Sequence, residues 1–165
     1  MKDFNKLYNS LKKKIKKHGF IQEDKRLNRK TYSLPGHFEV IKDPLLLVYL
    51  ENQKPLNKYN ADWRRLSINF SSVVSEAKDD LNSRRLMLLN DHGYYSTYQC
   101  FTHFQFVYTH RKEFDMYVYQ RSSDLSKLHD DLVFFAYVMK EFRQKTETNV
   151  TKLVVIYGNL HYAIY

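Results

Sequence analysis

The residues of this sequence that could do chemistry are one thiol and three guanidinium groups: Cys100, Arg84, Arg85 and Arg121. Cys100 is the only cysteine, which excludes an internal disulfide and a cysteine-rich metal site. A lone cysteine commonly packs as a small inert side chain. Guanidinium groups close to the thiol would lower its pKa and favour the reactive thiolate. The sequence leaves both interpretations of Cys100 open.

The arginines occur in two polar segments, "NSRRL" and "YQRSSD". Arg84 and Arg85 follow a serine, and Arg121 precedes Ser122. A guanidinium group presents its donors in a fork that matches phosphate oxygens, and a neighbouring hydroxyl adds a further donor. These segments therefore favour a phosphate-binding site. The alternative is that Arg84 and Arg85 pair on the surface with the acids at 79–80.

Hydrophobic periodicity predicts the elements that must position these residues. The predicted elements of the C-terminal half are, in order, a helix at 67–83, strands at 84–90, 98–110 and 115–122, a helix at 131–142 that is apolar nearly all round, and a strand from 151 with a turn at Gly158. Strands that flank a buried helix indicate a single α+β domain, residues 1–165, around one sheet.

The N-terminal third is less regular. Residues 20–37 are predicted as polar turns and short extended pieces, and the apolar run 44–50 as either a buried strand or a short helix. Residues 52–65, with Pro55 and three asparagines, are predicted as a connector. No apolar run approaches the roughly 20 residues of a membrane span, so a cytoplasmic protein is the simplest interpretation.

Nearly all of the net charge of +9 lies at the start of the chain, where residues 1–30 carry eleven Lys or Arg against three acids. Within 3–18, apolar residues recur at helical spacing while lysines occupy the other faces, which predicts a basic amphipathic helix that ends at Gly19. One interpretation is a packed helix with a solvated basic face. The other is a contact with nucleic acid or another polyanion.

Four segments occur in the same order, and at similar spacing, as motifs of one enzyme family: "DLNSRRLMLLN", "QCFTHFQF", "YQRSSD" and "YGNLHY". The segment "YNADWRR" is similar to the Y-G-x-x-W-R pattern of the same family. Over about residues 58–165 the chain thus resembles the thymidylate synthase and deoxycytidylate hydroxymethylase family. The resemblance implies one mixed sheet with a long buried helix, and a homodimer formed through a face of that sheet.

The resemblance also implies a role for each motif residue. Cys100 would be the nucleophile that adds to C6 of a pyrimidine nucleotide monophosphate. Arg121 and Ser122 would hold its 5′-phosphate, while Arg84 and Arg85 would reach the phosphate bound by a partner subunit. The cofactor implied is 5,10-methylenetetrahydrofolate, which would donate the one-carbon unit.

Three further residues would line the site: Gln105, Asp124, which counts with Cys100 as catalytic, and His161, which would contact the sugar. With a one-residue gap, Asp131 falls on the position that reads the base, where a carboxylate suits the donating amine of cytosine. Without the gap Leu132 falls there. The first alignment places the chain nearer the phage deoxycytidylate hydroxymethylases, with a catalytically degenerate nucleotide- or nucleic-acid-binding protein as the alternative.

The chain also departs from the family pattern. It is shorter, and the glycine of the loop that lies against folate is replaced by Lys127 or Leu128. Residues implied in nucleotide binding are therefore better matched than residues implied in cofactor binding. No metal site is predicted.

Overall fold

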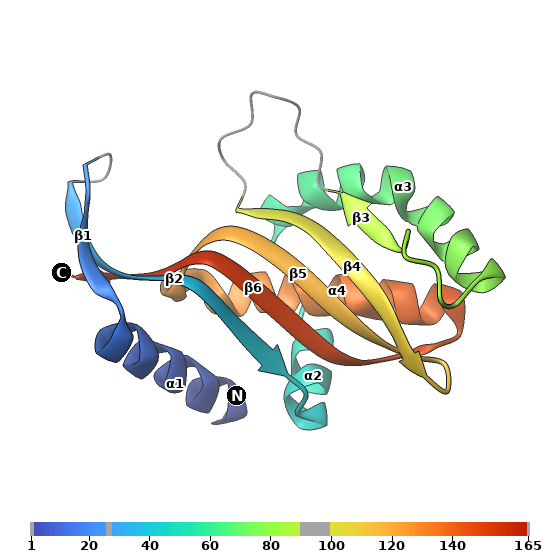
Figure 1. The fold of residues 1–165 in the computed structure, drawn as a ribbon, viewed down its shortest axis with the longest axis horizontal. Helices are drawn as coiled ribbons and strands as arrows, with labels where there is room; N and C mark the ends of the chain where they lie inside the picture. Colours follow the sequence, from blue (N-terminus) through green and yellow to red (C-terminus); the bar gives the residue numbers. More distant parts are fainter. Residues whose placement is uncertain (1, 26–27, 90–99, 165) are drawn as a thin grey trace.

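The computed structural model describes residues 2–25, 28–89 and 100–164, which fold around one six-stranded sheet (Figure 1). The strand order is β1-β2-β6-β5-β4-β3. The strands are β1 (Phe20–Asp24), β2 (Arg29–Ile41), β3 (Met87–Leu89), β4 (Phe101–His110), β5 (Glu113–Asp124) and β6 (Asn149–Ile164). Of the described strand pairs, β5 and β6 run parallel and the others antiparallel. The expected α+β class with one mixed sheet is confirmed.

The helices are α1 (Lys2–His18), α2 (Pro44–Glu51), α3 (Asn60–Asp79) and α4 (Leu128–Thr146), with short 3-10 turns at η1 (Asn57–Tyr59) and η2 (Leu125–Lys127). Helix α4 connects the parallel strands β5 and β6 and lies across one face of the sheet (Figure 1). Its apolar positions are buried nearly all round, as its sequence predicts. The Phe142 ring stacks on Phe106 of β4 with 3.7 Å between the ring centroids, which ties this helix to the sheet.

Helix α1 confirms the predicted basic amphipathic helix. Leu11 and Ile15 are completely buried, and the helix contacts β2, β6 and α2. It ends before Gly19, where an added Cβ would lie 2.5 Å from the backbone oxygen of Ile15 and 2.7 Å from that of Ser33. Such distances exclude a side chain, so the glycine lets the chain pass directly from α1 into the sheet.

The structure differs from the sequence-based expectation in three places. Residues 20–37, expected as polar turns and short extended pieces, contain β1 and most of the long strand β2. The expected connector 52–65 contains η1 and the start of α3, which begins at Asn60. The turn expected at Gly158 is absent, because β6 continues straight through it and pairs with both neighbours.

The apolar run 44–50, which the sequence left open, is helix α2. Asp43 caps it by accepting a hydrogen bond from the backbone N–H of Leu45 at 3.0 Å. Among the described residues no helix is long and apolar enough to cross a membrane.

Candidate functional site

Five consecutive residues at the end of β5, Gln120 to Asp124, hold the candidate site together. Gln120 and Ser123 contact Asp131 of α4, and Ser122 and Asp124 contact His161 of β6. Arg121 contacts Cys100 before β4, and Asp124 also contacts Arg29 of β2. Together the five residues bring these parts of the fold to one end of the sheet.

Cys100 lies directly before β4 and next to Arg121. The backbone N–H of Arg121 donates a hydrogen bond to the backbone oxygen of Cys100, and the pairing of Phe101 with Gln120 continues the ladder. Cys100 is half-buried and Arg121 is exposed. Cys100, the expected nucleophile, and Arg121, the expected phosphate ligand, are thus neighbours at the ends of adjacent strands.

Asp131, in the first turn of α4, is half-buried and accepts three hydrogen bonds. The hydroxyl of Tyr59 donates to Oδ1, while Gln120 Nε2 at 2.8 Å and Ser123 Oγ at 3.3 Å donate to Oδ2. Burial raises the pKa of Asp131 above its usual value, although the hydrogen bonds from Tyr59 and Gln120 oppose the increase. The network fixes the orientation of this carboxyl group against the end of β5.

His161 of β6 joins Ser122 and Asp124, because its ring lies between them. Its Nδ1 is 3.3 Å from Ser122 Oγ, and its Nε2 is 3.9 Å from Asp124 Oδ2. Arg29 Nη2 donates to the same carboxylate oxygen at 3.2 Å. Three of the expected site residues therefore form one cluster, with an arginine from β2 added to it.

The pKa of Asp124 is lowered by this environment. Burial alone would raise it, but hydrogen bonds from the backbone N–H and hydroxyl of Ser126, at 3.0 and 2.9 Å, favour the ionised form. The charges of His161 and Arg29 act in the same direction. Asp124 is therefore a carboxylate held in place, which positions the histidine ring beside Ser122.

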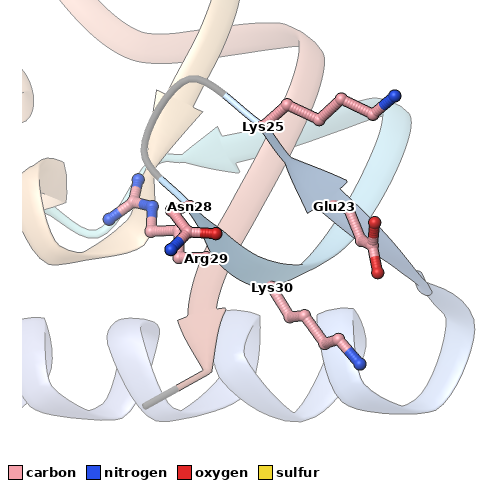
Figure 2. Close-up of a pocket in the computed structure, with 5 residues that line it drawn as sticks. All are labelled: Glu23, Lys25, Asn28, Arg29 and Lys30. Atoms are coloured by element: carbon pink, nitrogen blue, oxygen red, sulfur yellow. The ribbon is translucent and has the colours of Figure 1, made fainter.

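A polar cleft of about 310 Å³ opens beside this cluster. It is lined by Gln22, Glu23, Lys25, Arg29, Thr31, Ser33, Ser122, Asn159 and His161. Figure 2 shows the adjoining hollow in the β1–β2 hairpin, where Arg29 projects away from Lys25 and Lys30. The buried Oδ1 of Asn159 and Oε1 of Gln120 have no hydrogen-bond partner within the described ranges. Asn159 lines the cleft, so its oxygen could accept a hydrogen bond from a ligand there.

Three expected site residues lie elsewhere. Gln105 pairs with Tyr117 in the middle of β4, and alternation from the buried Phe104 places it on the sheet face opposite α4. Arg84 and Arg85 are exposed between α3 and β3, at the other end of β4 from Cys100. Arg85 Nε lies 3.9 Å from Glu76, so the surface pairing expected with the acids at 79–80 involves a different acid.

Sequence reasoning missed Arg29, Asn159, Gln120 and Tyr59 as members of the site. Arg29 is 95 residues from Asp124, and nothing in sequence order indicates that contact. Gln120 lies within "YQRSSD" and Asn159 within "YGNLHY". Their closeness in sequence to Arg121 and His161 could have identified them as site residues. Tyr59 begins the "YNADWRR" segment, whose tyrosine and tryptophan both pack on α4 through Phe134 and Tyr137.

The segment 126–129, which the resemblance aligns with a folate-binding loop, makes other contacts. Asp124 caps the turn by accepting hydrogen bonds from Ser126, and Leu128 is buried. The His129 ring packs edge-on against Phe4, with 5.0 Å between centroids, and lies 3.2 Å from the hydroxyl of Tyr49. Since Leu128 is buried and His129 contacts α1 and α2, only Ser126 and Lys127 of this segment are exposed, which leaves little of it to contact a folate.

No family model matches the sequence, and no curated protein matches it. Within residues 2–25, 28–89 and 100–164, no group of three or more His, Cys, Asp or Glu side chains gathers as a metal site. The function must therefore be argued from the geometry of the residues at the end of β5.

Proposed function

We propose that this chain is a pyrimidine nucleotide C5 one-carbon transferase, acting on deoxycytidylate in the manner of a 5-hydroxymethylase. The observation that carries the proposal is the convergence on the end of β5: Arg121 beside Cys100, Gln120 and Ser123 on Asp131, and Ser122 and Asp124 on His161. Addition to the base of a nucleotide needs a thiol, a group that orients the base and cations for the phosphate, and candidates for all three lie at this end of the sheet.

In this proposal the nucleotide phosphate binds Arg121 and Ser122, and the sugar lies against His161 in the polar cleft. Holding the phosphate fixes the base beside Cys100, which converts thiol addition into a unimolecular step. The thiolate forms a bond to C6, and the electron pair of the C5–C6 double bond makes C5 nucleophilic. C5 would then form a bond to the one-carbon unit of the donor, whose carbon–nitrogen electron pair leaves with the donor. Loss of the C5 proton to solvent, addition of water to the new methylene carbon and departure of the thiolate from C6 restore the aromatic base.

Asp131 is the proposed base-reading residue, because an oriented carboxyl group can accept a hydrogen bond from the N4 amine of cytosine. Three of its approximately four lone-pair positions are used by Tyr59, Gln120 and Ser123. One acceptor position remains for the substrate. The one-carbon donor implied by the resemblance is 5,10-methylenetetrahydrofolate, which would have to bind outside 126–129.

The proposal includes a homodimer, since Arg84 and Arg85 lie too far along β4 to reach the site of their own subunit. The sheet face opposite α4 is open and apolar, with Phe38 64% and Leu89 50% exposed. Phe38, Val40, Val154, Ile156 and Tyr117 line a hollow of about 460 Å³ on it. A second copy stacked on this face would bury that surface and bring in its arginines.

The test is release of tritium from the C5 position of labelled dCMP and dUMP, with and without methylenetetrahydrofolate. We expect release from dCMP, none from Cys100→Ser, and a raised KM in Arg121→Ala because phosphate binding is weakened. Failure of both nucleotides to release tritium, under conditions where dCMP raises the melting temperature, would overturn the enzymatic proposal.

A mixing experiment tests the dimer within the same assay. Cys100→Ser and an Arg84→Ala/Arg85→Ala double variant should each be inactive alone. If the arginines act across the interface, randomly mixed subunits should recover about a quarter of wild-type activity, because half of the dimers carry one intact site. No recovery after subunit exchange would contradict the arginine role.

One observation favours a second candidate, a nucleotide-binding protein that has lost one-carbon transfer: the contacts of 126–129 with Phe4 and Tyr49. This candidate predicts that dCMP stabilises the protein, by binding only its folded state, while methylenetetrahydrofolate does not. Thermal melts with each ligand, alongside the tritium assay, separate the two functions.

A further inference from the structure

Helix α1 presents a regular array of lysines on the side opposite its buried residues. Leu11 and Ile15 are completely buried, while Lys2, Lys6, Lys13, Lys16 and Lys17 are exposed. At 3.6 residues per turn, Lys2, Lys6, Lys13 and Lys17 fall within about 60° of one another around the helix axis. We call these four the outer lysines.

Two other lysines of this helix, Lys12 and Lys14, have a different role, because they hold it in place. Lys12 Nζ lies 4.5 Å from the centroid of the Tyr162 ring, and Lys14 Nζ lies 2.8 Å from Glu39. The outer lysines form no ion pair with any residue of the described ranges, and Asp3 is the only acid in the helix. Their charge is therefore available to a partner.

The positive surface continues from α1 onto the β1–β2 hairpin. Tyr162, which lies under Lys12, pairs with Tyr32 of β2, and Lys30 is two residues away on the same strand face. Figure 2 shows Lys30 projecting from β2 on the side away from Arg29. The cations of helix and hairpin thus follow one another along one side of the molecule.

We propose that the outer lysines bind the phosphate backbone of a nucleic acid, without reading its sequence. The array from Lys2 to Lys17 is roughly 22 Å long at 1.5 Å per residue. One strand of a duplex places about six phosphates along that distance. Lysine contacts to phosphate release condensed counterions, which gives binding that weakens steeply with salt.

The burial of α1 argues against two other occupants. A helix that binds a lipid surface inserts its apolar face, but Leu11 and Ile15 are already packed against the protein. A protein partner normally needs aromatic or other large anchors at the centre of the interface, and none of the exposed large apolar residues in the described ranges belongs to α1. Phosphate binding requires neither feature. This inference does not depend on the proposed transferase activity.

The test compares two variants with the same loss of charge. The first is Lys2→Gln/Lys6→Gln/Lys13→Gln/Lys17→Gln; the control is Lys42→Gln/Lys54→Gln/Lys78→Gln/Lys145→Gln, whose lysines are exposed elsewhere on the molecule. Fluorescence anisotropy with labelled single-stranded DNA, duplex DNA and RNA is measured across a KCl series. Circular dichroism melts check that both variants remain folded.

We expect wild type and the control to bind duplex DNA with a slope of log K against log [KCl] of about −3 to −4, the value for about four phosphate contacts. The outer-lysine variant should lose most of this slope and bind at least tenfold more weakly at low salt. If both variants bound nucleic acid equally weakly, the effect would come from net charge alone, and the proposal would be overturned. Binding that is restricted to anionic phosphatidylserine vesicles, with no affinity for any nucleic acid, would also overturn it.

Discussion

Asp131 illustrates how much of the candidate site is decided by single residues. Its carboxyl group accepts hydrogen bonds from Tyr59 of η1 and from Gln120 and Ser123 near the end of β5. Its orientation is therefore set before any substrate binds. Gln120 has a buried carbonyl oxygen without a partner among the described residues, beside the amide that donates to Asp131. If the side-chain amide of Gln120 rotated by 180°, it would present its carbonyl oxygen, an acceptor, to residue 131 in place of its N–H donor.

The hydrogen bond between Gln120 and Asp131 makes Asp131→Asn a test of base recognition. The substituted amide can donate to O4 of uracil, and Gln120 can turn its carbonyl toward the new amide. We expect the relative rate of tritium release to shift from dCMP toward dUMP by about 10- to 100-fold, the value of one hydrogen bond to a charged group. Unchanged selectivity would remove Asp131 from base reading and leave it a structural residue.

The same variant has a pH signature in the free energy of unfolding. Because burial raises the pKa of Asp131 above its usual 3.8, the folded protein binds this proton more tightly than the unfolded chain. The stability that Asp131 contributes is fully present below about pH 4, and it is lost as the pH rises through the raised pKa. Asp124 and Glu39, with lowered pKa values, act in the opposite sense.

Urea denaturation of wild type and Asp131→Asn between pH 3.5 and 7 isolates the effect, since the other carboxyl groups cancel in the comparison. The free energy of unfolding of wild type should fall relative to that of the variant as the pH increases. A difference that stays constant over this range would contradict the burial of an ionisable group at this position.

At the scale of elements, Gly158 sets how closely β6 approaches β5 beside the site. An added Cβ would lie 2.6 Å from the backbone oxygen of Arg121, a distance that real Cβ atoms essentially never show. The neighbouring atoms are backbone, so the strands themselves must move apart. The glycine therefore lets the Ser122–His161 contact form next to Arg121.

Gly158→Ala should lower the free energy of unfolding by about 1–3 kcal/mol, as expected for overpacking against backbone. It should also weaken nucleotide-dependent stabilisation, because Arg121 and Ser122 are displaced. The control is Gly36→Asn, at a position with φ of +64° and no atom near the added Cβ, where asparagine is tolerated. Equal melting temperatures for wild type and Gly158→Ala would contradict the close approach.

The elements differ in how well the sequence predicts them, for physical reasons. β4, β5 and α4 were predicted because alternation and an all-apolar helix reflect burial against one core. β2 was not, since Pro35–Gly36 resembles a turn and its buried Thr31 and Ser33 are polar. Those two residues face a polar cleft, so they carry no apolar signal. The sequence motifs identified the site residues near Arg121. They could not identify Arg29, because its contact with Asp124 forms only in the folded sheet.

At the scale of the whole molecule, β6 connects two parts of the sheet, β1–β2 and β3–β5, that share no other strand pairing among the described residues. Ile41 of β2 pairs with Leu153, 112 residues later. Glu113 of β5 pairs with Asn149 only 36 residues later. The polar cleft takes residues from both parts, since Arg29 and Ser33 come from β2 and Ser122 from β5.

This arrangement has a consequence for the order of folding. Closing the longer loop costs about 1 kcal/mol more chain entropy than closing the shorter one, which favours early formation of β5, α4 and β6. Pulsed hydrogen exchange during refolding should show amides of β5 and β6 protected before those of β2; simultaneous protection would exclude this order. The thiol, Arg121 and Asp131 would then be assembled first, and the cleft for a ligand would be completed only when the basic N-terminal part docks.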